Sequence, residues 1–314
     1  MAAHRAPVVA GPTTTPTSIV LLGMHRSGTS ALARSLRELG AWLGSPEHIT
    51  RRSEHLLVQT CNQQILERLG GHWSAPPELE PGWTTRPEIA ALHPEARAAV
   101  GDLALASPSL WKDPRTCLTL DFWRARLTVE PIVVVSYRHP LEVAASLERR
   151  NSFGPGHVVA LWERYNRALL QSAAGLRCVV VAYADLVQEP EATLTSVCDR
   201  LGAFGVEFSR TPAEAAGAVD AERRHHVFAE LPDDVTTPQQ RALWDALGAL
   251  PAESAAFVAP RLPEPHAASR ELLSARAATI RTERELAEAR ADLRSRRALT
   301  RTLAQRLRPS EWRT

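Results

Sequence analysis

The sequence SIVLLGMHRSGTSALARSL, residues 18–36, joins a short apolar run to a glycine-bounded turn and the start of a helix. Residues 18–22 are typical of a buried parallel strand. Gly23 ends this run, Gly28 lies five residues further on, and residues 29–39 are predicted to be helical. Such a turn forms a phosphate cradle, because glycine lets the backbone approach an anion and the first free N–H groups of the helix point at it.

The glycine spacing matches the phosphate loop of nucleoside triphosphatases, but the residues after it do not. Those enzymes continue with a Lys for the β/γ-phosphates and a Ser or Thr for magnesium. Here Thr29 and Ser30 follow the second glycine, and the cation is Arg26, inside the turn. The turn therefore predicts a phosphate site without the usual triphosphate chemistry. A glycine-rich turn without a ligand is the alternative.

The loop GMHRSGTS resembles the 5′-phosphosulfate loop of sulfotransferases, which transfer the sulfuryl group of 3′-phosphoadenosine 5′-phosphosulfate (PAPS) to an acceptor. The resemblance implies that PAPS is the co-substrate and that the loop binds its 5′ end. The loop residues concerned are Arg26, Ser27, Gly28, Thr29 and Ser30.

A second nucleotide-binding element follows residues 131–137, PIVVVSY, the clearest central strand of the sequence. Arg138 comes directly after this strand, and Ser146 lies eight residues further on in a predicted helix over residues 141–150. A helix rises about 1.5 Å per residue, so both side chains can reach one phosphate. In sulfotransferases an Arg and a Ser at this spacing bind the 3′-phosphate of PAPS. The alternative is a surface Arg and a Ser that faces its own helix.

The resemblance covers residues 18–201 and is closest to bacterial sulfotransferases that read GMHRSGTS, KDPR, YRHPLEVAASL and YADL in this order. It is more distant to tyrosylprotein sulfotransferases, in which the loop Arg acts together with a Glu and with the Lys of a Lys-Asp-Pro turn. The residues that match these three here are Arg26, Glu54 and Lys112. Two further matches to nucleotide contacts are Arg150 and Tyr183.

The implied roles agree with the chemistry of sulfuryl transfer. Charge builds on the oxygen that bridges to the leaving nucleotide, and Arg26 and Lys112 are expected to stabilise it in place of a metal ion. The acceptor hydroxyl has to lose a proton, and Glu54 is the predicted base. The alternative bases are His25, His48 and His55. The family commonly has an aromatic residue before this Glu, whereas residues 52–55 here read Arg-Ser-Glu-His.

Lys112 is the only lysine among 37 basic residues, and every other one is Arg. Its position indicates a place where a compact ammonium is needed, or else the chance survival of one lysine. It follows a brief extended piece, residues 109–111, and begins a Lys-Asp-Pro-Arg turn. Ligands of open α/β sheets bind at such strand ends.

Strand patterns alternate with helical ones and are apolar on both faces, which predicts an α/β fold with a doubly wound parallel sheet. The strands are expected at residues 18–22, 109–111, 131–137 and 178–182, and helices at 29–39, 51–69, 94–105, 118–127, 141–150, 156–173 and 191–201. Residues 73–94 are rich in Pro and Trp and are predicted to be an irregular loop that covers the acceptor. Its Trp73 and Trp83 suit a sugar ring or an aromatic ring.

Residues 269–308 are predicted to form a polar helix without Gly or Pro. Leu272, Leu286, Leu293 and Leu307 are spaced by multiples of seven, which is a moderate coiled-coil signal because the second core position of the heptad is poorly apolar. The helix could self-associate, dock on a partner or pack on the chain's own body. Its positive charge makes binding to membrane phosphates a further, weaker alternative. The expected division is a disordered tail over residues 1–17, a sulfotransferase domain over 18–265 and a helical or coiled-coil extension over 266–314.

The composition narrows the class of protein. The formal net charge of +2 implies no general polyanion-binding surface, so nucleic acid is not an expected partner. Four scattered cysteines without a CxxC pair argue against zinc and disulfides, and favour a reducing, cytoplasmic location. No apolar run reaches the ~20 residues that span a bilayer.

Two other functions compete with a sulfotransferase that acts on a carbohydrate, small-molecule or natural-product acceptor. One is a P-loop kinase of a small metabolite, which the missing lysine after Gly28 disfavours. The other is a non-catalytic nucleotide-binding or oligomerisation module. The sequence does not identify the acceptor.

Overall fold

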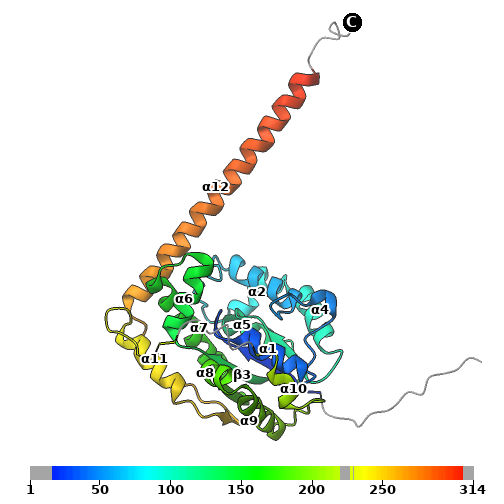
Figure 1. Ribbon diagram of the computed structural model, residues 1–314. Helices are drawn as coiled ribbons and strands as arrows, with labels where there is room; N and C mark the ends of the chain where they lie inside the picture. The colour runs from blue at the N-terminus through cyan, green and yellow to red at the C-terminus, as the bar shows by residue number, and fades with distance from the viewer. Residues whose placement is uncertain (1–15, 220–226, 229, 307–314) are drawn as a thin grey trace, which may run out of the picture.

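The computed structural model describes residues 16–219, 227–228 and 230–306. In this part of the chain a five-stranded sheet lies between layers of helices, and one long helix extends away from the body (Figure 1). The predicted α/β class is confirmed. Most of the predicted tail, residues 1–15, lies outside the described residues. Thr17 already belongs to the fold, because its carbonyl accepts a hydrogen bond of 3.0 Å from the Ser109 amide.

The sheet has the strand order β2-β1-β3-β4-β5. Its parallel strands are the four that the sequence predicts: β1 (Ser18–Leu22), β2 (Ser109–Lys112), β3 (Ile132–Tyr137) and β4 (Cys178–Ala182). β5 (Glu253–Ser254) pairs antiparallel with β4. Sequence periodicity did not reveal β5, because two residues without an apolar run carry no strand pattern.

Successive side chains of each strand face opposite layers, as strand geometry requires. In β1, Ile19 and Leu21 belong to one hydrophobic core, and Val20 and Leu22 belong to the other. The first core is covered by α1 (Thr29–Glu38), α8 (Tyr183–Gln188), α9 (Pro190–Ala203) and α10 (Pro212–Ala216). The second is covered by α2 (Leu56–Arg68), α3 (Pro87–Ala90), α4 (His93–Leu103), α5 (Thr116–Arg124), α6 (Pro140–Asn151), α7 (Pro155–Ser172) and α11 (Pro238–Gly248).

The helix predicted over residues 51–69 begins later than expected, at Leu56. Ser53 has a φ of 58°, a left-handed conformation that interrupts a helix. His55 is the N-cap, and its side chain accepts a hydrogen bond from the Val58 amide. Glu54 therefore lies in the segment before α2 and not in its first turn.

The loop predicted over residues 73–94 is largely irregular, with a short 3₁₀ turn, η2 (Trp83–Thr85), followed by α3. Trp83 is only 6% exposed and packs in the hydrophobic core. The expectation that Trp83 contacts the acceptor is therefore wrong. Trp73 is half-buried and keeps access to the cleft described below.

The long helix α12 (Ala267–Arg306) lies against α7 at its base and then leaves the body (Figure 1). Ser269, Leu273 and Ile280 face the body, whereas Leu286 and Leu293 of the predicted stripe are 49% and 57% exposed. The alternative in which the leucine stripe packs on the chain's own body is therefore wrong for Leu286 and Leu293, because a different stripe of the helix contacts the body. Leu307, the last leucine of the predicted stripe, lies outside the described residues. In the described part of the chain, each helix is too short or too polar to cross a bilayer.

Candidate active site

The loop between β1 and α1 is packed closely against its neighbours. A Cβ atom at Gly23 would lie 2.5 Å from the carbonyl oxygen of Ser136, whose hydroxyl donates a 2.8 Å hydrogen bond to the Ser27 carbonyl. Gly28 has a φ of +88°, and a Cβ atom there would lie 2.1 Å from the ring of Tyr183. Both glycines of the sequence motif are therefore explained by backbone geometry.

Lys112 ends β2, beside β1, and is only 2% exposed. Its three donor positions match three acceptors. Nζ donates to the Ser30 hydroxyl at 2.9 Å, to the Arg52 carbonyl at 3.1 Å and to Oε1 of Glu54 at 2.9 Å. Burial lowers the pKa of Lys112, and the Glu54 carboxylate opposes that shift. Three acceptors around one nitrogen match the three donors of an ammonium, which agrees with the prediction that a compact cation is needed here.

Glu54 is 4% exposed and is held from both sides. Its second oxygen, Oε2, accepts a 2.6 Å hydrogen bond from the Gln59 amide, one turn into α2. The carboxylate is thus fixed next to Lys112 and Ser30, at the N-terminus of α1. Gln59 is a contact that the sequence alone did not indicate.

Arg26 and Arg138 lie together above the loop. Nε of Arg26 donates to the Ser146 hydroxyl at 2.8 Å, and Nη1 of Arg138 donates to the Arg26 carbonyl at 3.0 Å. Arg138 also donates to Glu142 at 2.8 Å and lies 4.3 Å from the centre of the Tyr183 ring. Arg26 thus contacts both Arg138 and Ser146, the two side chains that are predicted to bind one phosphate.

The positive charges of this region repel one another. Burial lowers the pKa of Arg26, and Arg150, Arg138 and Arg52 lower it further. Burial and Arg52 also lower the pKa of Arg150. Such an arrangement favours the binding of an anion between the guanidinium groups.

One narrow cleft gathers most of the predicted catalytic groups. Its lining includes Arg26, Thr29, Ser30, Glu54, Lys112 and Arg150, together with His25, Arg52, Gln59, Trp73, Pro114 and Arg115. Four other predicted nucleotide contacts lie next to this cleft without lining it: Ser27, Arg138, Ser146 and Tyr183. Arg138 and Ser146 contact Arg26, and Tyr183 packs against Gly28.

The three histidines proposed as alternative bases lie in different surroundings. Nε2 of His55 contacts Asp102 at 2.7 Å, and Nδ1 of His48 contacts the same carboxylate at 3.1 Å. Burial alone would raise the pKa of Asp102, but hydrogen bonds from Ser45 and His55 hold this pKa well below its usual range. These two histidines anchor the chain on either side of Glu54 to α4, and neither lines the cleft. His48, His55 and Asp102 each offer one atom of a kind that can bind a metal ion, and these three atoms lie within 4.8 Å of one another.

His25 does line the cleft. Its ring lies 4.7 Å from that of Trp73 and 5.5 Å from that of Tyr165. Burial lowers the pKa of His25 well below the usual value, and the positive charges of Arg115 and Lys112 lower it further, so the imidazole is neutral.

A buried carboxylate supports the cleft from behind. Asp113 is fully buried and accepts hydrogen bonds from Nη1 of Arg115 at 2.7 Å and from Asn62 at 3.3 Å. Burial raises the pKa of Asp113, and Arg115 opposes that rise. The Lys-Asp-Pro-Arg turn therefore places its Lys in the cleft and uses its Asp to hold the Arg.

The family model of the sulfotransferase family matches residues 16–204, more than half of the chain. The chain belongs to the sulfotransferase family. It is therefore an enzyme of sulfuryl transfer, and the loop, the strand-end lysine and the following arginines all fall inside the matched residues.

Two solved structures are similar to this sulfotransferase family member. The sulfotransferase domain from the Synechococcus PCC 7002 olefin synthase is 20% identical, with 83% of this chain and 95% of that chain covered at a TM-score of 0.42. The sulfotransferase domain from the curacin biosynthetic pathway is 17% identical, with 82% and 96% covered at a TM-score of 0.42. A search of curated proteins found no match.

Proposed function

We propose that this sulfotransferase moves the sulfuryl group of PAPS to a hydroxyl or amine of a carbohydrate or small natural product. The observation that carries the proposal is the Lys112–Glu54–Ser30 group at the N-terminus of α1, next to crowded arginines. A proton acceptor and two kinds of cation meet there around one cleft.

The phosphosulfate is assigned to the loop. The N–H groups at the N-terminus of α1 and the guanidinium of Arg26 would hold its oxygens. Arg138, Ser146 and Arg150 would hold the 3′-phosphate, and Tyr183 would lie beside the nucleotide. Binding of the anion would offset the burial and the repulsion by neighbouring arginines that together lower the pKa of Arg26.

Glu54 is assigned as the general base. Its carboxylate takes the proton of the acceptor hydroxyl while the acceptor oxygen bonds to sulfur. The bond from sulfur to the bridging oxygen breaks, and its electron pair leaves with adenosine 3′,5′-bisphosphate. Lys112 and Arg26 stabilise the charge on that oxygen, so we propose that protein cations do the work that magnesium does in kinases. His25 stays as the alternative base, because it also borders the cleft.

Calorimetry with adenosine 3′,5′-bisphosphate and with ATP plus magnesium tests the co-substrate. We expect the bisphosphate to bind without metal and ATP to bind at least about tenfold more weakly, a difference of about 1.4 kcal/mol. Equal or tighter binding of ATP would favour the metabolite kinase and reject PAPS. Incubation with PAPS and mixed hydroxylated acceptors, followed by chromatography of the released bisphosphate, tests turnover.

Two further assignments concern the surroundings of the enzyme. We propose self-association through the exposed part of α12, supported by Leu286 and Leu293, which are half-exposed on a helix that leaves the body. We also propose a cytoplasmic location, which the four free cysteine thiols support. Trp73, which borders the cleft, would contact a ring of the acceptor.

A further inference from the structure

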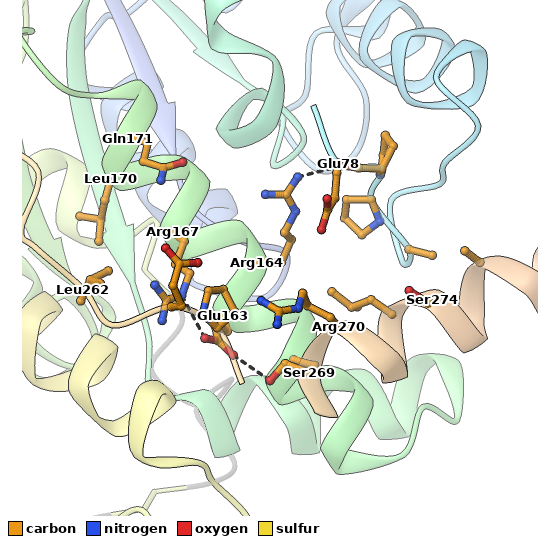
Figure 2. A pocket seen from close by; sticks show the side chains of 18 of the residues that line it. Glu78, Glu163, Arg164, Arg167, Leu170, Gln171, Leu262, Ser269, Arg270 and Ser274 are labelled. Carbon is orange, nitrogen blue, oxygen red and sulfur yellow. Dashed lines mark hydrogen bonds and ion pairs between the residues drawn. The ribbon is translucent and has the colours of Figure 1, made fainter. Parts of the chain in front are cut away.

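A second cavity, of ≈ 460 Å³, lies between α7, residues 75–78, residues 259–265 and the base of α12 (Figure 2). It shares no lining residue with the cleft that contains Glu54 and Lys112. Its volume is within the range of small-molecule sites, roughly 300–1,000 Å³.

The frame of this cavity is fixed by a buried polar network. Glu163 is 1% exposed and accepts hydrogen bonds from Nε of Arg167 at 2.9 Å, from Ser269 at 2.9 Å and from Gln240 at 3.2 Å. Figure 2 shows the Glu163–Ser269 contact between α7 and α12. Because α7, α11 and α12 are tied together at this point, the cavity is preformed.

Two guanidinium groups of α7 border the cavity, and that of Arg167 is paired with Glu163. Arg164 is partly buried and donates a 2.8 Å hydrogen bond to the Pro77 carbonyl, but it forms no ion pair within the residues that the structure describes. Burial lowers the pKa of Arg164. Nη2 of Arg167 is buried without a hydrogen-bond partner in the same described part of the chain. Figure 2 shows Arg270 of α12 on the other side of the cavity.

The remaining walls are mostly apolar and include Ala160, Leu170, Leu262 and Leu273. We propose that this cavity binds an amphipathic carboxylate of medium chain length, with its carboxylate at Arg164 and its apolar body between α7 and α12. A guanidinium binds a carboxylate through two parallel hydrogen bonds. The carboxylates of Glu78, Glu163 and Glu264 also border the cavity, and they repel a doubly charged phosphate more strongly than a singly charged carboxylate.

Calorimetry with decanoate tests this site, and 1-decanol serves as the uncharged probe of equal chain length. Arg164→Gln removes the charge but keeps a donor for the Pro77 carbonyl. Arg281→Gln is the control for the same chemical change, because Arg281 is exposed on α12 outside the cavity. Ser274→Trp fills the cavity from its rim. We expect decanoate to bind the wild type and Arg281→Gln equally, to lose at least about tenfold in affinity with Arg164→Gln, and to lose binding with Ser274→Trp.

Four results would overturn the inference: no binding of decanoate to the wild type, equal binding of decanol, unchanged affinity of a folded Arg164→Gln variant, or displacement of decanoate by adenosine 3′,5′-bisphosphate. The last result would place decanoate in the catalytic cleft. If circular dichroism shows that Arg164→Gln is unfolded, Ser274→Trp decides, and wild-type affinity in that variant rejects the site. The inference is independent of the proposed reaction.

Discussion

Replacing Lys112 with Met is expected to destabilise the folded protein by about 3–5 kcal/mol, the usual cost of removing one partner of a buried ion pair. Lys112 and Glu54 are 2% and 4% exposed, and their atoms lie 2.9 Å apart. Methionine leaves the Glu54 carboxylate with the Gln59 amide as its remaining hydrogen-bond donor among the described residues. It also removes the donors to Ser30 and to the Arg52 carbonyl.

The measurement is thermal unfolding followed by circular dichroism at pH 7.5. Since each kcal/mol corresponds to about 2–4 °C in a domain of this size, the melting temperature is expected to fall by roughly 6–20 °C. The double variant Glu54→Gln/Lys112→Met removes both charges and is expected to recover more than half of the loss, because a neutral pair needs no charge compensation. A single variant within about 2 °C of the wild type, or a double variant as unstable as the single one, would refute the ion-pair argument.

Four further outcomes are expected. Arg138→Ala weakens adenosine 3′,5′-bisphosphate by about 2–3 kcal/mol in calorimetry and leaves adenosine 5′-phosphosulfate nearly unchanged, and equal losses for both ligands would reject the 3′-phosphate role. Glu54→Gln lowers turnover by ~10²–10⁴-fold at unchanged bisphosphate affinity, whereas an active variant would assign the base to His25. Burial lowers the pKa of His72 from 6.5 to about 4, and the charges of nearby arginines contribute to this shift. Between pH 6.5 and about 4 the unfolded chain therefore binds a proton at His72 and the folded chain does not, so the free energy of unfolding falls as the pH drops through this range. His72→Gln should make this fall shallower in denaturant titrations at pH 7 and 5, and an unchanged slope would contradict it. Removing residues 285–314 is expected to lower the number of chains per particle, obtained from light scattering as particle mass divided by chain mass, while bisphosphate affinity holds. An unchanged number of chains per particle would contradict self-association through α12.

The central sheet could be predicted because its strands are continuous β-branched runs. The run before Arg138 and the run that ends at Ala182 are buried on both faces, and few other structures accommodate such segments. The phosphate loop was predictable for a similar reason, since Gly23 and Gly28 occupy positions where a side chain would collide with the backbone of β3 or with Tyr183.

Other features depend on contacts that no local pattern encodes. The start of α2 was misplaced because residues 51–55 are compatible with a helix, and only the left-handed Ser53 and the contacts of Glu54 show otherwise. Glu142 looks like an ordinary acidic residue in the first turn of a helix, yet it pairs with Arg138. The seven-residue spacing of leucines in α12 does not predict which side chains at the base of that helix are buried. The base packs against α7, and the side chains that face the body there are Leu273 and Ile280.

The charges around the cleft explain why the nucleotide would also act as a structural element. Lys112 is paired with Glu54, and Arg138 is paired with Glu142. Arg26, Arg52 and Arg150 form no ion pair within the described residues. Burial lowers the pKa of Arg26 and of Arg150, and repulsion from neighbouring arginines lowers both further. A ligand with several negative charges reverses this repulsion, so its binding free energy adds to the stability of the loop and of the N-terminus of α1. The same charges that make the site receptive to an anion therefore make the unliganded loop less stable, and we expect the bound nucleotide to raise the melting temperature of the whole domain.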